Sequence, residues 1–179
     1  MILGIQELLR LIKEKNLIEN LSKRELKNPE GAGFDLRIGE VYNLEGYGYL
    51  GIDKRETPKS KLVVKYNPKK VTSYIFEPGK YYLIKTVEKV NLPNDISGII
   101  FPRTTLFRSG LALFNGIVNT GYQGELTFGL YNLGKSNIKV DMGARVVHIT
   151  FHQVLGEGSQ YRGQWQGGRV TTEGREAQV

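Results

Sequence analysis

The chain has 179 residues, of which 40% are hydrophobic, and a formal net charge of +7. It contains no cysteine, which excludes disulfide bonds, thiolate catalysis and zinc-thiolate sites. This size and composition predict a single globular domain, or one domain with a terminal arm. No apolar run approaches the length of a membrane span, and the N-terminus carries no evident targeting segment. We therefore expect a cytoplasmic protein with no membrane partner.

The first predicted element is an amphipathic helix at residues 4–16. Its apolar residues recur at helical spacing and are Ile5, Leu8, Leu9 and Ile12. Charged side chains fill the opposite face, as expected for a helix that packs on a core with one side. The polar segment 23–31 contains Pro29 and is predicted to be a connection.

From residue 34 onward the pattern is typical of a β protein. Short alternating or β-branched segments recur, and turns rich in glycine, proline and asparagine separate them. The predicted strands lie at residues 34–44, 61–66, 81–92, 96–101, 126–133, 137–142 and 145–154. Many short strands at even spacing favour a sandwich, a jelly roll or a barrel. The chain's two histidines, His148 and His152, share one face of the last strand, but no third metal ligand is evident nearby.

Much of the positive charge lies between residues 54 and 70. The basic residues there are Lys54, Arg55, Lys59, Lys61, Lys65, Lys69 and Lys70. Pro58 and Pro68 interrupt this run, which favours a solvated loop and strand edge over a nucleic-acid surface. A positive field of this kind also attracts polyphosphate ligands. We therefore expect no nucleic-acid partner.

After Val154 the composition changes to glycine, glutamine, serine, threonine and arginine. Such a segment has too few apolar residues to form a core of its own. We predict a domain at residues 1–155 and a mobile arm at 156–179, which is either disordered or ordered by what it closes over. The single tryptophan, Trp165, favours a docked arm.

The segment 101–134 carries the side chains that predict chemistry. It opens with guanidinium and hydroxyl groups, on Arg103, Thr104, Thr105 and Arg108. Such groups hold phosphate oxygens. A glycine-punctuated turn around Tyr122 follows, and an aromatic ring in a tight turn can stack on a flat ring or a sugar. Two hairpins with ordinary turn glycines would explain this stretch equally well if it stood alone.

Five segments in chain order resemble the motifs of the trimeric dUTPase and dCTP deaminase superfamily. They are GAGFDLRIG (31–39), PRTTLFRSGL (102–111), GIVNTGYQGELTFGLYNLG (116–134), GARVVHITF (143–151) and YRGQWQGGRVTTEG (161–174). Five motifs in order are a specific signal, and the tail is similar to that of archaeal dUTPases. The resemblance implies a distorted jelly-roll β-barrel with a short N-terminal helix. It also implies a homotrimer whose three interface sites bind a deoxynucleoside triphosphate with Mg²⁺.

The resemblance also implies roles for the residues at the phosphate end of the site. The hydroxyls of Thr104 and Thr105 would bond the phosphates, and Arg103 and Arg108 would supply positive charge beside them. An interface salt bridge is the alternative for Arg103. Asp35 matches a position associated with the metal, and an ordinary turn aspartate is the alternative there.

For the nucleoside end, the resemblance implies that main-chain groups of Gly116, Ile117 and Val118 read the base edge. Tyr122 would lie against the deoxyribose and exclude a 2′-hydroxyl, the alternative being a plain core aromatic. The arm would close over the nucleotide and expel water. Its contacting residues would be Tyr161, Gln164, Trp165, Gln166 and Arg169.

Two positions decide which reaction the resemblance favours. The water-orienting aspartate of dUTPases is Asn119 here, and the catalytic glutamate of deaminases is Gly129. Glycine cannot perform acid–base chemistry, which argues against deamination. Asparagine can accept a hydrogen bond from water but takes no proton, and loss of a general base costs ~10²–10⁴ in rate. Glu125 is a nearby carboxylate that could substitute.

The sequence therefore predicts a dUTP nucleotidohydrolase, which forms dUMP and diphosphate and keeps uracil out of DNA. A protein that binds or senses dUTP without turnover is the alternative that Asn119 favours, and a dCTP deaminase is the third interpretation.

Overall fold

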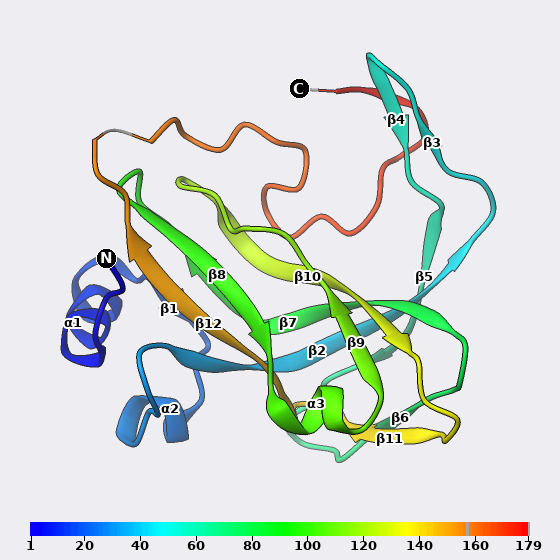
Figure 1. Ribbon diagram of the computed structural model, residues 1–179, viewed down its shortest axis with the longest axis horizontal. Helices are drawn as coiled ribbons and strands as arrows, with labels where there is room; N and C mark the ends of the chain where they lie inside the picture. Colours follow the sequence, from blue (N-terminus) through cyan, green and yellow to red (C-terminus); the bar gives the residue numbers. More distant parts are fainter. Residues whose placement is uncertain (157, 179) are drawn as a thin grey trace.

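The fold is built on one strongly curved eight-stranded sheet that closes almost into a barrel (Figure 1). The computed structural model describes residues 1–156 and 158–178. Along the sheet the strand order is β8-β12-β2-β7-β10-β9, and β5 and β1 pair with β2 and β7. These strands are β1 (Ile18–Glu19), β2 (Phe34–Glu45), β5 (Lys59–Lys65), β7 (Tyr81–Asn91), β8 (Ile96–Pro102), β9 (Leu111–Phe114), β10 (Gln123–Asn132) and β12 (Arg145–Gln153). Every pairing in this sheet is antiparallel.

Two small sheets flank the barrel. One pairs β6 (Ser73–Phe76) with β11 (Ile138–Asp141). The other joins the hairpin of β3 (Tyr49–Leu50) and β4 (Lys54–Glu56) to β13 (Glu176–Ala177), which lies near the end of the chain. The C-terminal arm therefore returns to the body of its own chain.

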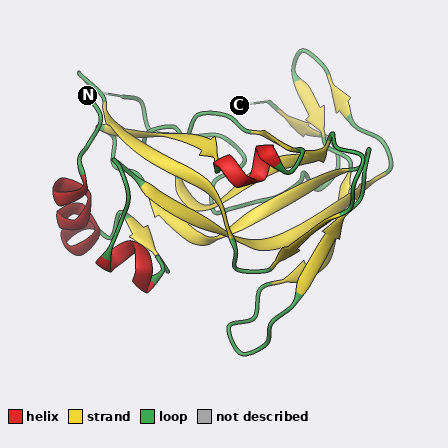
Figure 2. Cartoon of the chain, turned by 60° about the horizontal axis from the view of Figure 1, so that its bottom comes forward, coloured by secondary structure: helices red, strands yellow, loops and turns green. Residues whose placement is uncertain are grey.

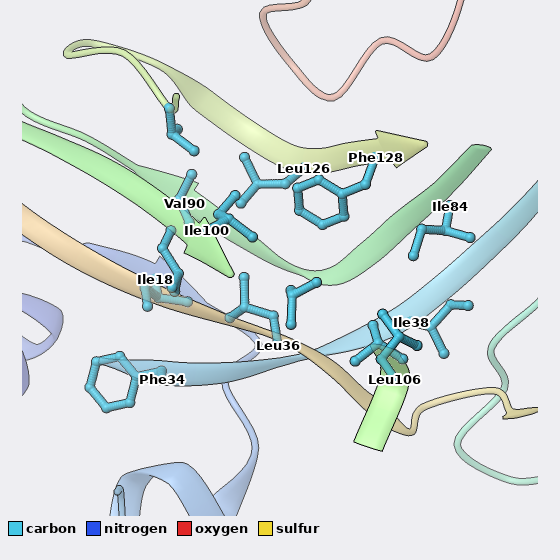
Figure 3. Packing of buried hydrophobic residues seen from close by; sticks show 14 of the residues in the cluster. Ile18, Phe34, Leu36, Ile38, Ile84, Val90, Ile100, Leu106, Leu126 and Phe128 are labelled. Carbon is cyan, nitrogen blue, oxygen red and sulfur yellow. The ribbon is translucent and has the colours of Figure 1, made fainter. Parts of the chain in front are cut away.

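The core fills the inside of the barrel because alternate residues of each strand point inward. Leu36 and Ile38 of β2 meet Leu126 and Phe128 of β10 there, all almost fully buried (Figure 3). The other face of β10 carries Glu125, Thr127 and Gly129 and looks away from this core. Of these three residues, Thr127 lines the candidate site.

Helix α1 (Ile5–Lys15) confirms the predicted N-terminal helix. Its residues Leu8 and Leu11 are buried, and Asn16 ends it in a left-handed conformation with φ of 54°. Figure 2 shows the helices lying outside the sheet. Among the described residues, none of the helices is long and apolar enough to cross a membrane.

Two short helices were not predicted. Helix α2 (Lys23–Lys27) lies in the segment expected to be a connection, and the Ser22 hydroxyl caps it by accepting from the main-chain N–H of Glu25 at 3.3 Å. Helix α3 (Thr104–Arg108) lies between β8 and β9. Helices of one turn show no repeat of apolar positions, so periodicity cannot reveal them. The seven predicted strands all occur, which confirms a mainly β barrel with an N-terminal helix.

Candidate functional site

A cavity of about 400 Å³ opens where the sheet splits beside β10. The β9–β10 ladder ends at the pair Phe114 and Gly129. The chain then leaves β10, and Val118 forms an isolated bridge with Gly98 of β8 instead. The 115–121 loop and the first half of β10 therefore diverge, and the cavity lies between them.

The 115–121 loop supplies one wall of the cavity. Its lining residues are Gly116, Ile117, Val118 and Asn119. Within the described chain, Gly116 and Ile117 make no main-chain hydrogen bond. Free N–H and C=O groups in an open strand can pair with the donors and acceptors of a planar base. Gly116 and Ile117 thus have free main-chain groups where base recognition was predicted, and that role stays a prediction. Val118 differs, because its N–H and C=O are both bonded to Gly98 at 2.9 Å, so its main chain is not free to read a base.

Tyr122 forms a second wall. Its side chain is buried, and its hydroxyl donates to the main-chain carbonyl of Glu125 at 2.6 Å. Burial raises the pKa of Tyr122 to about 12, so the phenol is neutral near pH 7. Because its hydroxyl is already bonded, Tyr122 offers the cavity its ring. The predicted sugar contact and its alternative, a core aromatic, are both compatible with this geometry.

The C-terminal arm closes the cavity from outside the barrel. Tyr161, Trp165 and Arg169 all line it, and the ring of Tyr161 meets that of Tyr122 edge-on with centroids 5.5 Å apart. In Figure 1 the arm passes over β10 and the 115–121 loop. The structure therefore brings together three of the arm residues predicted for the site.

The other two predicted arm residues hold the arm in place and do not line the cavity. Gln166 donates to the carbonyl of Gly121 at 3.1 Å and accepts from the N–H of Gln123 at 3.0 Å. Gln164 accepts from Arg55 and donates to the carbonyl of Ala177 at 2.7 Å. Gly124 permits this close packing, because a Cβ there would lie 2.5 Å from the nitrogen of Gly168.

Thr57, Leu83, Ile100 and Thr127 also line the cavity, and sequence reasoning missed them. Thr127 lies between predicted motif residues on β10. Its hydroxyl oxygen is buried and has no hydrogen-bond partner within the described part of the chain. All four are residue types common in strands and loops of any β protein, so the sequence contained no signal for these positions.

Two of the residues predicted for the phosphate end, Asp35 and Arg103, lie in a separate group of charged side chains. One carboxylate oxygen of Asp35 faces Arg103 at 2.9 Å and Arg145 at 3.0 Å, while the other meets Nδ1 of His148 at 2.9 Å. Behind them, the buried Glu25 accepts from the main-chain N–H of Asp35 at 3.1 Å. We refer to Glu25, Asp35, Arg103, Arg145 and His148 as the charged cluster.

Electrostatics in the charged cluster favour an ionised Asp35. Burial alone would raise the pKa of Asp35, but the hydrogen bond with His148 and the charges of Arg103, His148 and Arg145 outweigh it. The pKa of Asp35 is therefore lowered. Sequence reasoning did not place Glu25, Arg145 and His148 in this group, although the last two belong to the fourth motif.

Asp35 does not fit a resident metal ligand. Both of its oxygens already face cationic or hydrogen-bonding side chains, and the described residues contain no group of three His, Asp or Glu side chains that could hold a metal. The two histidines also have separate partners, since Nε2 of His152 bonds the hydroxyl of Thr150 at 2.9 Å. We therefore derive no step through a metal bound by Asp35.

Thr104 and Thr105 share a second cavity of about 330 Å³ with Asp35, Arg103 and His148. Both threonines are exposed. Arg108 is exposed on α3 and lines neither cavity. In Figure 1, α3 lies at the opposite end of the barrel from the 115–121 loop and the arm. One chain therefore does not bring the predicted phosphate and nucleoside groups together.

Gly129 faces the ring of Tyr81. A Cβ at this position would lie 2.1 Å from the Tyr81 hydroxyl, so any side chain there would displace the phenol. Glu125 does not replace the missing carboxylate, because its side chain lies beside Gly168 and 3.9 Å from Lys89. No aspartate or glutamate is among the described residues that line the 400 Å³ cavity.

Known proteins match this chain along most of its length. Residues 2–154 match the family model described as dCTP deaminase-like. The chain is 30% identical over 173 residues to a dCTP deaminase of Caldivirga maquilingensis, covering 96% of this chain and 94% of that protein. It is 32% identical over 135 residues to a probable deoxyuridine 5′-triphosphate nucleotidohydrolase of Methanothermobacter thermautotrophicus, covering 75% and 85% of the two chains.

Solved structures show the same fold at lower identity. A deoxycytidine triphosphate deaminase from Agrobacterium tumefaciens superposes with a TM-score of 0.63 at 18% identity, over 86% of this chain. This chain spans about half of that longer protein, 48% of its length. A mutant dUTPase from phage phi11 of S. aureus superposes with a TM-score of 0.51 at 16% identity, over 82% of this chain and 93% of that one.

Proposed function

Because the chain belongs to the dCTP deaminase-like family, we propose that it binds dUTP in the 400 Å³ cavity and hydrolyses it to dUMP and diphosphate. Relatives with similar identity carry the names of both dCTP deaminase and dUTP nucleotidohydrolase, so family membership allows either reaction. The choice between the two reactions rests on the residues at positions 119 and 129.

The observation that carries the proposal is at Gly129. Deamination needs an acid–base group that exchanges protons with the base and the attacking water. This position offers no side chain, and the Tyr81 phenol occupies the space beside it. Hydrolysis of the triphosphate leaves the base unchanged and needs no such group there.

Recognition of the nucleoside follows from the walls of the cavity. The free main-chain groups of Gly116 and Ile117 would pair with the uracil edge, and the Tyr122 ring would pack on the deoxyribose. Trp165 and Arg169 would cover the nucleotide and limit access of water, which strengthens electrostatic interactions in the site. The Asn119 side chain would orient the water that attacks the α-phosphorus, with diphosphate as the leaving group.

A complete site would need two copies of the chain. The hydroxyls of Thr104 and Thr105 lie at the end of the barrel away from the cavity, so a neighbouring copy would bring them to the phosphates. This supports an oligomer, and we propose a homotrimer because the five motifs resemble those of a trimeric superfamily. Magnesium would arrive on the triphosphate, whose oxygens are the hard ligands that it prefers.

A test of the shared site uses two variants, each expected to be inactive alone. One chain carries Thr104→Ala with Thr105→Ala, and the other carries Asn119→Ala. After the two are mixed and refolded together, mixed oligomers contain some intact sites and should regain activity. Mixtures that stay inactive, while each variant forms the normal oligomer, would contradict a site built from two copies.

A dUTP-binding protein without turnover is the second candidate, and Asn119 favours it. No carboxylate lines the cavity among the described residues, so proton transfer from water would lack a strong base. Such a protein would sequester or sense dUTP.

The deciding experiment incubates the protein with dUTP and, separately, with dCTP, both with Mg²⁺. Diphosphate and dUMP from dUTP would support the hydrolase, and saturable dUTP binding with no product would support the second candidate. Ammonia from dCTP would overturn the choice made at Gly129. UTP serves as the control for the sugar.

A further inference from the structure

The C-terminal arm is held by side chains of the β3–β4 hairpin and of the residues just after it, none of which belongs to the five motifs. Thr57, which follows β4, and Thr172 bond reciprocally, since the N–H of each donates to the hydroxyl of the other at 3.0 and 2.9 Å. Thr172 is buried there. The hydroxyls of Ser60 and Thr171 add a contact at 2.8 Å. These hydrogen bonds connect the arm directly to the body of the chain.

Arg55 lies in this hairpin, and its side chain contacts the part of the arm that is nearest the cavity. Its Nε donates to the side-chain oxygen of Gln164, and its guanidinium lies over the Trp165 ring, 5.4 Å from the centroid. A guanidinium in this position attracts an indole face. Arg55 thus contacts two consecutive arm residues, of which Trp165 lines the 400 Å³ cavity.

The end of the arm also contacts the hairpin, through the main chain around Arg55. Residues Glu176 and Ala177 pair with Arg55 and Lys54, and the N–H of Gln178 donates to the carbonyl of Asp53 at 2.9 Å. Strand pairing holds the main chain at the end of the arm, while the Arg55 side chain holds the Trp165 ring. Because the hairpin is covalently part of the body, these contacts define where the arm lies over the cavity.

We propose that the β3–β4 hairpin is the docking platform for the arm, and that Arg55 is a positioning residue that holds Trp165 at the cavity before nucleotide binds. Arg55 does not line the cavity and acts through Trp165. A ring that is already positioned spares the nucleotide the cost of ordering it. The docking part stands by itself, whereas the effect on nucleotide affinity rests on the proposed function.

The chain provides its own probe, because Trp165 is the only tryptophan. Its fluorescence in ligand-free protein should respond to Arg55→Ala with a shift to longer wavelength and about a twofold or larger rise in acrylamide quenching. Nucleotide affinity, or KM where turnover is measurable, should weaken on the order of tenfold, since a cation–π contact and a charged hydrogen bond are lost together. The rate of turnover at saturation should change little.

Lys54→Ala is the matched control, because Lys54 is the exposed neighbour on the same strand and pairs with the arm through its main chain. It should leave both fluorescence and affinity unchanged. Arg55→Lys retains the positive charge and should restore part of the affinity. Ser60→Ala loosens the same junction elsewhere and should increase quenching to a smaller extent.

Unchanged quenching in Arg55→Ala would overturn the docking role, whether or not the protein binds dUTP. Increased quenching with unchanged nucleotide affinity would overturn the positioning role and leave the docking platform. If wild-type protein binds no nucleotide, the proposed function fails, and the quenching comparison still decides the docking.

Discussion

The two ends of the barrel differ in the number of charged side chains that they contain. The 400 Å³ cavity is lined by aromatic, aliphatic and neutral polar residues, with Arg169 as its one charged residue among those described. At the other end, the charged cluster buries two carboxylates against three guanidinium or imidazole groups. The first end suits a base and sugar, whose recognition depends on shape and neutral hydrogen bonds. The second carries the threonines and arginines for which phosphate contacts were predicted, and the two groups lie apart in one chain.

Because of this difference, we expect substitutions at the two ends to have different effects. A change in the cavity alters what can bind, because its walls contribute few ion pairs. A change in the charged cluster alters stability first, because removing one member leaves buried charge without its partner. Four variants test this contrast, in order of expected effect.

The largest effect is expected where the cavity lacks a base. Asn119→Asp introduces a carboxylate of almost the same shape, and should increase dUTP hydrolysis by about 10²–10⁴. Diphosphate release measures the change. Asn115→Asp, in the same loop, is the control and should show no increase. An unchanged rate in Asn119→Asp would place the base elsewhere.

Removal of the arm should separate binding from folding. A chain ending at Ser159 loses the outer wall of the cavity, and its affinity for dUTP should fall about a hundredfold, in line with several lost contacts. The barrel core lies outside the arm, so the melting temperature should fall much less than in the charged-cluster variant below. An equally large fall would mean that the arm belongs to the folding unit.

The charged cluster should show the opposite behaviour. Asp35→Asn leaves Arg103 and Arg145 without their carboxylate and should lower the free energy of unfolding by about 2 kcal/mol, less than for a fully buried pair because both arginines are about a third exposed. Urea denaturation measures this change. Asp95→Asn, on an exposed turn, is the control and should be close to neutral.

The same variant has a pH signature. The pKa of Asp35 is lowered in the folded protein, so its stabilising contribution is present above about pH 4 and is lost as the pH falls below that value. Wild-type protein should therefore lose more stability in acid than Asp35→Asn. Parallel pH profiles for the two proteins would contradict the ion-pair role.

The smallest effect concerns the sugar. Tyr122→Ala removes the ring beside the cavity and should let UTP compete with dUTP about tenfold better. Tyr122→Phe is the control, since it keeps the ring and loses only the bond to the Glu125 carbonyl. Competition binding measures both. Discrimination that persists in Tyr122→Ala would show that another group excludes the 2′-hydroxyl.

Much of the fold was predictable because its long elements repeat locally. Helix α1 and the seven predicted strands follow from apolar alternation or periodicity, which depends on neighbours along the chain. The motif residues were also predictable, including the grouping of Tyr122 with Trp165 and Arg169. Helices α2 and α3 were not, because one helical turn is too short to show a period.

The sequence by itself thus determined the β-rich barrel, the N-terminal helix, the missing carboxylates at Asn119 and Gly129, and part of the cavity lining. Tertiary structure alone decided that Asp35 pairs with Arg103, that Tyr81 covers Gly129, and that the phosphate and nucleoside groups lie at opposite ends. The physical reason is that these contacts join residues far apart in the chain through strand register. In that register Tyr81 lies opposite Tyr131, two residues beyond Gly129, and local patterns contain no information about such pairing.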